Sequence, residues 1–349
     1  MNPAFDLPPV CRRSAWRSHS PVRAFRTERN GGLDGDTALR SPTCIACALI
    51  ATISALCGAP RPAAAQVQLP SVNLGLTNFE DGFGRPGWFL QEFPTYFDSD
   101  ALKDANGATV PGPNELTTFS TTTHIVYVSP VRAIKGRVAF EALQPWADVD
   151  ARFGKAPALK TRGFADLTLG AGVQWAPKKI GRGIFVHRFM LDVGVPTGEY
   201  NGRKPINVGN NYYVVDPYYA FTYEVGKVEV SARFHYLWNS INRSPYTGLG
   251  ARSVQAGQAF HVNYAISYEI VPKLRVGFNG YWLKQLTDNK LNGIDIPNSR
   301  EAVVGLGGGL QLQIGKNSWI HLNGYTETGA RNRAQGSSLM FRVSRSIPG

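Results

Sequence analysis

The fold is decided by residues 260–286, which read FHVNYAISYEIVPKLRVGFNGYWLKQL. From Phe260 to Glu269, apolar and polar positions alternate, so every second side chain lies on the same face. Residues 271–273 turn the chain, and the alternation resumes from Leu274 to Asn279. A period of two predicts a β-hairpin with one apolar and one polar face. This pattern fits a soluble β-sandwich, and it also fits a membrane barrel whose apolar face meets lipid.

The connections between predicted strands distinguish these two folds. Long segments rich in Gly, Asn, Pro and charge alternate with short turns, as in outer-membrane barrels with long extracellular loops and short periplasmic turns. The strands, about ten to fifteen residues long, are suited to crossing a membrane at a tilt. We therefore expect an all-β fold, a transmembrane antiparallel up-and-down β-barrel of about 12 strands spanning residues 87–349. The predicted strands are 87–98, 116–129, 135–149, 163–175, 183–195, 211–225, 227–239, 257–269, 273–286, 301–314, 318–328 and 337–346.

Three details of this pattern predict further features of the barrel. Pro145 interrupts the alternation of residues 135–149. The glycine run 305–309 is followed by no helix pattern, so it predicts close approach or curvature in a strand rather than a phosphate site. Aromatic residues near strand ends predict the two membrane interfaces. They are Tyr212, Tyr213, Tyr223, Trp238, Tyr268 and Trp282.

Residues 1–65 predict an extended leader with a signal peptide. A basic residue, Arg40, precedes an apolar run at 44–56, which is too short to span a bilayer as a helix. The sequence PAAAQ follows at 62–66, so we expect cleavage between Ala65 and Gln66 and a bacterial outer-membrane location. A lipoprotein site at Cys57 is the alternative. Residues 66–86 show few strand signals and are predicted to form a periplasmic N-terminal segment or a plug-like piece.

Several function classes are disfavoured by the composition. The chain carries 37 Lys+Arg against 25 Asp+Glu, but the basic residues are dispersed, which argues against a nucleic-acid partner. The pair Cys44 and Cys47 lies in the apolar run of the leader rather than in the βαβ setting of a redox motif. We expect no cofactor and no energy coupling.

The alternation also predicts which polar side chains face the lumen. Charges of both signs occur among them, so they suit either a water-filled path or bridges between strands. The lumen-facing candidates are Asp166, Arg188, Asp192, Glu229, Arg233, His235, His261, Asn263, Glu269, Arg275, Asn279, His321, Asn323 and Arg342.

The histidines raise the possibility of enzyme or metal chemistry. Barrel lipases use a serine activated by histidine and asparagine, but no serine is evidently paired with His261 or His321. A metal site formed by His235, His261 and His321 would require three distant strands to converge, and the spacing is not that of metal ligands. We therefore predict no catalytic residues and no metal site.

Several short motifs carry a family resemblance. They are PSVNLG at 70–75, DANG at 104–107, DVGVPTGEY at 192–200, GY at 324–325 and FRVS at 341–344. With these motifs, the mature chain resembles the bacterial outer-membrane proteins named for the meta-pathway of phenol degradation, often described as transporters. That resemblance implies a barrel, and it suggests passage of aromatic or hydrophobic compounds.

Two functions are compatible with these observations. The first is an outer-membrane channel that passes small aromatic or hydrophobic compounds by diffusion. The second is a plugged structural or adhesive barrel that acts through its extracellular loops, mainly 196–210 and 240–256. Outer-membrane lipid, lipopolysaccharide and the barrel-assembly machinery are the expected partners, in addition to the solutes.

Overall fold

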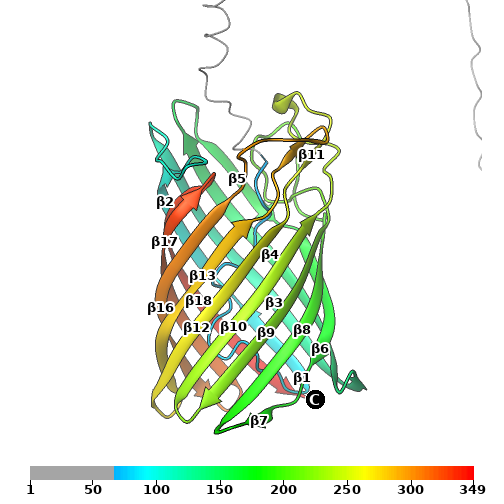
Figure 1. The fold of residues 1–349 in the computed structure, drawn as a ribbon, viewed down its shortest axis with the longest axis vertical. Coiled ribbons are helices and arrows are strands. Elements are labelled where there is room, and N and C mark those ends of the chain that lie inside the picture. The colour runs from blue at the N-terminus through cyan, green and yellow to red at the C-terminus, as the bar shows by residue number, and fades with distance from the viewer. Residues whose placement is uncertain (1–66) are drawn as a thin grey trace, which may run out of the picture. The chain divides into compact units, whose positions relative to one another are not determined.

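A closed antiparallel barrel is the main feature of the structure (Figure 1). The structure, a computed structural model, describes residues 67–349. The predicted leader and its cleavage site therefore lie outside the described residues. Short connections gather at one end of the barrel, here called the turn end, and long connections gather at the other, the loop end (Figure 1).

The barrel sheet contains 15 strands, which form 12 wall segments. β1 and β2 belong to one wall segment, because both pair with β3 and with β18 and so close the barrel. β5, β6 and β7 follow one another along a second wall segment. The bounds are β1 Gly87–Glu92, β2 Thr95–Leu102, β3 Asn114–Ala133, β4 Gly136–Phe153, β5 Leu159–Phe164, β6 Leu167–Gln174, β7 Lys178–Ile180, β8 Gly183–Val195, β9 Val214–Val225, β10 Val228–Asn239, β12 Ala259–Val271, β13 Leu274–Gln285, β16 Ala302–Gly315, β17 Ser318–Arg331 and β18 Ala334–Pro348.

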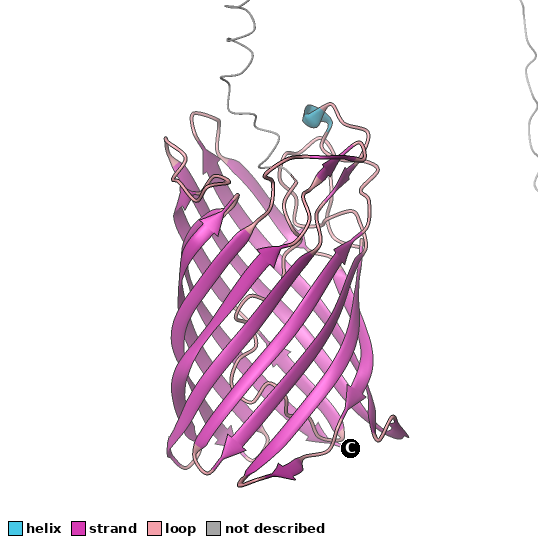
Figure 2. Ribbon diagram, viewed as in Figure 1, coloured by secondary structure: helices cyan, strands magenta, loops and turns pink. Residues whose placement is uncertain are grey.

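The long connections contain little regular structure (Figure 2). Three two-residue strands, β11 Val254–Gln255, β14 Lys290–Leu291 and β15 Ile294–Asp295, form a small sheet at the loop end. One 3₁₀ turn occupies Thr247–Leu249. No helix among residues 67–349 is long and apolar enough to cross a membrane.

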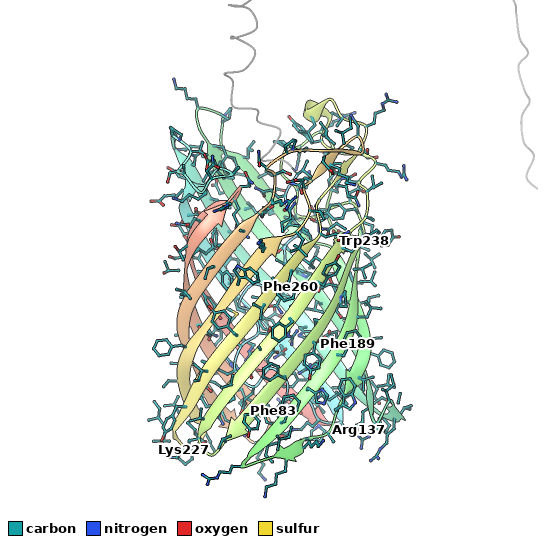
Figure 3. The ribbon with its side chains drawn as sticks, in the orientation of Figure 1. Phe83, Arg137, Phe189, Lys227, Trp238 and Phe260 are labelled. Atoms are coloured by element: carbon teal, nitrogen blue, oxygen red, sulfur yellow. The ribbon has the colours of Figure 1, made fainter. Side chains whose placement is uncertain are left out.

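Apolar side chains cover the outer face of the wall. In β13, Phe278 is 78% exposed, whereas its neighbours Asn279 and Arg275 are buried. Figure 3 shows Phe189 and Trp238 projecting from the outside of the barrel. The alternation read from the sequence therefore separates an apolar outer face from a polar inner face.

Most of the predicted interface aromatics lie on the outer face near strand ends. Tyr213, Trp238, Tyr268 and Trp282 are exposed, and Tyr223 is half-buried. Tyr212 does not belong with them. It is buried just before β9 begins, so its prediction as an interface residue is wrong.

The strand β4 continues through Pro145, where the sequence predicts an interruption. On the turn-end side of this residue β4 pairs with β6, and on the loop-end side it pairs with β5. Proline lacks a backbone N–H, so it is tolerated where a strand loses no ladder bond. Here the change of partner falls at Pro145 itself, and its carbonyl accepts a hydrogen bond from Ala165 N at 2.9 Å.

The glycine run in β16 allows close approach of neighbouring groups. A Cβ on Gly305 would lie 2.2 Å from the Tyr281 ring, and one on Gly309 would lie 2.0 Å from Asn323 Oδ1. Side chains of the adjacent strands β13 and β17 occupy the inner face where these glycines have none. The structure thus agrees with a packing role for this run.

Residues 67–86, here called the plug, run inside the barrel before the chain enters β1 at the turn end (Figures 1 and 2). The segment does not extend away from the barrel as a periplasmic stretch. Wall side chains bond its backbone along its length: Asn289 Nδ2 donates to Val67 O at 2.6 Å, and Gly82 N donates to Thr222 Oγ1 at 2.8 Å. These hydrogen bonds satisfy backbone groups that have no β-ladder partner.

Candidate functional site

The polar lumen and the plug within it form the candidate site. Of the fourteen residues that the sequence predicts to face the lumen, thirteen are buried. The fourteenth, Glu269, is half-buried and accepts a hydrogen bond from Lys273 N in the turn after β12. Asp166 lies between β5 and β6 and holds a loop instead of lining the central lumen. Its two carboxylate oxygens accept hydrogen bonds from Gly198 N and Asn210 N.

At the loop end, apolar and polar contacts hold the start of the plug. Leu69, Val72 and Leu74 pack against a buried cluster of the wall that includes Tyr281 and Tyr325. This cluster excludes water from the first part of the plug and favours its docking.

One carboxylate also holds this part of the plug. Glu301, just before β16, accepts a hydrogen bond from Leu69 N at 2.8 Å. Burial raises the pKa of Glu301, and the nearby Arg333 offsets this effect only in part.

In the middle of the barrel, neutral hydrogen bonds hold the plug. Asn263 Oδ1 accepts from Gly75 N at 2.9 Å, and Asn263 Nδ2 donates to Asn73 O at 3.0 Å. Tyr325 Oη donates to Gly75 O at 2.7 Å. Gly75 has φ +75°, and a Cβ there would lie 2.8 Å from the Tyr325 ring. Glycine is therefore required at this point for both backbone conformation and space.

Toward the turn end, a buried ion pair joins the plug to the wall. Arg233 of β10 donates to both carboxylate oxygens of Asp81, at 2.8 and 2.5 Å, and both side chains are only 5% exposed. Arg188 of β8 donates to the carbonyls of Asp81 and Phe83 at 3.0 and 2.6 Å. A bidentate pair of this kind is among the stronger charge-assisted contacts in proteins.

A second set of charged contacts surrounds Glu80. Its carboxylate lies 3.4 Å from Arg275 Nε and accepts a hydrogen bond from Gln311 Nε2 at 2.5 Å. Arg275 also pairs with Glu224 of β9. The Glu80 N–H donates to Glu229 at 2.9 Å. Five of the predicted lumen residues therefore contact the plug: Arg188, Glu229, Arg233, Asn263 and Arg275.

Other predicted lumen residues join strands to one another. Asn279 Nδ2 donates to Asn323 Oδ1 at 2.6 Å across the glycine run. Arg342 Nη2 lies 2.8 Å from His321 Nε2 between β17 and β18. His321 is thus far along the wall from His235 and His261, which lie opposite each other on the adjacent strands β10 and β12.

The expectation that these histidines lie on distant strands is therefore wrong for His235 and His261. Their rings stack at 4.1 Å, and His235 Nδ1 lies 2.9 Å from the carboxylate of Asp216 on β9. The two histidines are 26 positions apart along the chain, and pairing of the consecutive strands β10 and β12 brings them into direct register.

Several residues of the site were missed from the sequence. Asp81 and Glu80 lie in the plug, which has no alternation to indicate their orientation. His124 of β3 lies 2.8 Å from Glu141 of β4, and both are buried. Glu141 and Asp216 could have been found from the alternation of their strands. Each lies two positions from a buried residue, Ala139 or Tyr218, and so shares the inner face with it.

A cavity of about 640 Å³ lies beside the last residues of the plug, toward the turn end. Its walls include plug residues such as Phe83, which Figure 3 places low in the barrel. Its lining mixes apolar groups with Arg and Gln side chains. The aromatic and aliphatic lining residues from the wall are Phe89, Val126, Val128, Trp175 and Trp319.

Comparison with known proteins places this barrel in a family. A model of the family described as "Putative MetA-pathway of phenol degradation" matches residues 99–343. The chain belongs to this family. The resemblance read from the sequence motifs is thereby confirmed. The family match begins within β2, after the plug, and ends within β18.

Solved outer-membrane barrels resemble this chain to different degrees. An outer membrane channel from Pseudomonas putida F1 has a TM-score of 0.68 at 16% identity, covering 76% of this chain and 97% of that chain, and it shares the fold. The transport unit of the Escherichia coli autotransporter AIDA-I is more distant, with a TM-score of 0.48 at 10% identity, covering 82% of this chain and 95% of that chain. The β domain of the Bordetella autotransporter BrkA has a TM-score of 0.44 at 12% identity, covering 76% and 100%.

A comparison with curated proteins gives no match. The family and the fold agree with the apolar outer face in identifying an outer-membrane β-barrel of 12 strands. The predicted fold class and location are therefore confirmed.

Proposed function

We propose that the barrel passes small aromatic or other hydrophobic compounds across the outer membrane by diffusion. The observation that carries this proposal is the cavity beside the plug, whose lining combines aromatic and aliphatic side chains with numerous charged groups. Its volume, about 640 Å³, falls within the range of about 300–1,000 Å³ typical of small-molecule sites. The family description and the channel fold support the same proposal.

The plug determines how such passage is controlled. It occupies the lumen from the loop end to the cavity, so a solute following the lumen meets it before reaching the turn end. With long loops outside and short turns in the periplasm, a solute from the medium meets the plug first. The proposal therefore includes displacement of part of the plug during passage, with no cofactor and no energy source.

The apolar outer face is proposed to contact outer-membrane lipid and lipopolysaccharide, after insertion by the barrel-assembly machinery. The alternative is a plugged structural or adhesive barrel that acts through its loops. The specific observation in its favour is the dense set of bonds that hold the plug in place. Solute flux separates the two proposals.

The test is a swelling assay on vesicles that contain the protein purified from outer membranes. We expect phenol-sized aromatic solutes to enter faster than sugars of similar size. Replacing Val126 with Trp fills the cavity from its wall, so this variant should reduce aromatic entry several-fold. The matched control is Ile125→Trp, because Ile125 is the adjacent residue on β3 and points outward.

Two results would contradict the proposal. A folded wild-type barrel that admits no aromatic solute would favour the structural alternative. Equal entry rates for V126W and I125W would show that the cavity is not on the route. In both cases, heat-modifiable mobility on gels verifies that the barrel is folded.

A further inference from the structure

A cluster of metal-ligating side chains lies in the barrel wall, apart from the plug contacts. Asp216, His235 and His261 each offer a ligand atom, and these atoms lie within 4.8 Å of one another. The three residues come from the adjacent strands β9, β10 and β12. His235 and His261 are direct partners across the β10–β12 pair, and their rings are nearly parallel, with an angle of 11° between them.

The ring nitrogens of this cluster are poorly satisfied. His261 is fully buried, and neither of its ring nitrogens has a hydrogen-bond partner among residues 67–349. His235 is 3% exposed, and its Nε2 also has no partner within that range. A buried polar atom without a partner is costly. A single bound group could pair with one nitrogen on each of the two stacked rings.

The surrounding charges favour a cation as that group. Asp192 of β8 lies directly opposite Asp216 in the β8–β9 register. Asp192 is buried, and its Oδ1 has no partner in the described chain. The nearest arginine in β10, Arg233, is already paired with Asp81.

We propose that Asp216, His235 and His261 bind a divalent first-row transition-metal ion. Two imidazoles and a carboxylate suit Zn²⁺, Ni²⁺ or Cu²⁺ better than Ca²⁺ or Mg²⁺. Zn–N bonds are about 2.0–2.1 Å long, so two ligand atoms on a tetrahedral ion lie about 3.3–3.5 Å apart. The ligand atoms here lie within 4.8 Å of one another, so turning the imidazoles about χ2 and drawing the atoms together by up to about 1.5 Å would form the site.

The site has a route of entry and room for a further ligand. The Asp216 side chain is 19% exposed, whereas the two histidines are buried. The carboxylate therefore forms the accessible edge of the cluster. Three protein ligands leave at least one coordination position for water or for a solute in the lumen. This inference goes beyond the proposed passage of hydrophobic compounds, and neither depends on the other.

The test is metal titration of the detergent-purified, full-length processed protein after treatment with a chelator. Zn²⁺ binding is followed by calorimetry, and Co²⁺ binding by its visible d–d absorption. We expect one ion per barrel. H235Q and H261Q should each weaken binding by at least about 100-fold, because losing a group that merely orients a ligand already costs about 10–100-fold. D216N should also weaken binding while keeping the side-chain size.

The matched control is H187Q. His187 of β8 points outward, where it stacks on Trp175 and contacts Tyr219, so its replacement should leave binding unchanged. A folded wild-type barrel that binds neither ion would overturn the proposal and leave water as the partner of the nitrogens. Binding that persists in H235Q and D216N would also overturn it. If H261Q fails to give a heat-modifiable barrel, those two variants decide the question.

Discussion

Replacing Asp81 with Asn should release the plug. Asp81 and Arg233 form a bidentate pair at 2.8 and 2.5 Å, and both side chains are 5% exposed. The substitution keeps the size of the side chain but leaves a buried guanidinium without its counter-charge. Breaking a buried pair in this way costs about 3–5 kcal/mol. About 1.4 kcal/mol corresponds to a factor of ten in an equilibrium constant. The equilibrium constant for displacing this part of the plug should therefore rise by about two to nearly four orders of magnitude.

Single-channel recording in planar lipid bilayers measures this effect. We expect D81N to open more often, or for longer, than the wild-type barrel. The double variant D81N/R233M removes the unpaired charge and should open less than D81N, because a buried pair can often be replaced by apolar groups at little cost. The control is D98N, the same chemical change at an exposed aspartate of β2. Identical conductance of folded D81N and wild type would refute the idea that this pair holds the plug.

Two further predictions follow from the charged groups of the lumen. Replacing Arg233 or Arg275 with Ala leaves Asp81 or Glu80 without its partner, so reversal potentials in a salt gradient should shift toward cation selectivity. Unchanged selectivity in both variants would contradict the inward orientation of these strands. Because burial raises the pKa of Glu301, its contribution to stability is present below its ordinary pKa of 4.5 and lost as the pH rises through the raised value. E301Q should therefore gain stability relative to wild type as the pH rises above 4.5 in urea unfolding, with E115Q, at an exposed site of β3, as the matched control.

The barrel wall was predictable because the alternation of side chains and the lengths of the connections independently indicate the same fold. In the hairpin of β12 and β13, a one-residue slip would turn Phe278 inward and Arg275 toward lipid, so the register is fixed by the side chains themselves. The lengths of the connections then separate a barrel from a sandwich. The strand bounds differ from the prediction most at β2, β3 and β4, each of which ends four residues later than predicted, and where β1 and β2 divide one predicted strand.

The plug was not predictable in the same way. Its contacts join residues far apart in sequence, such as Asp81 with Arg233 and Leu69 with Glu301. Its backbone bonds to wall side chains rather than to a ladder, so no period of two marks it. The histidine cluster was missed for a related reason, because strand pairing and not chain spacing brings His235 beside His261.

The plug also explains why the inward-facing charges are mixed in sign. If the inward side chains only lined a water-filled lumen, Arg188, Arg233 and Arg275 would face solvent. Here Arg233 and Arg275 face carboxylates of the plug, and Arg188 faces its carbonyls. Some of the charges that the sequence places along a water-filled path or in bridges between strands are thus groups that hold the plug. A change that frees these arginines would therefore both open the lumen and expose the charges that select what passes.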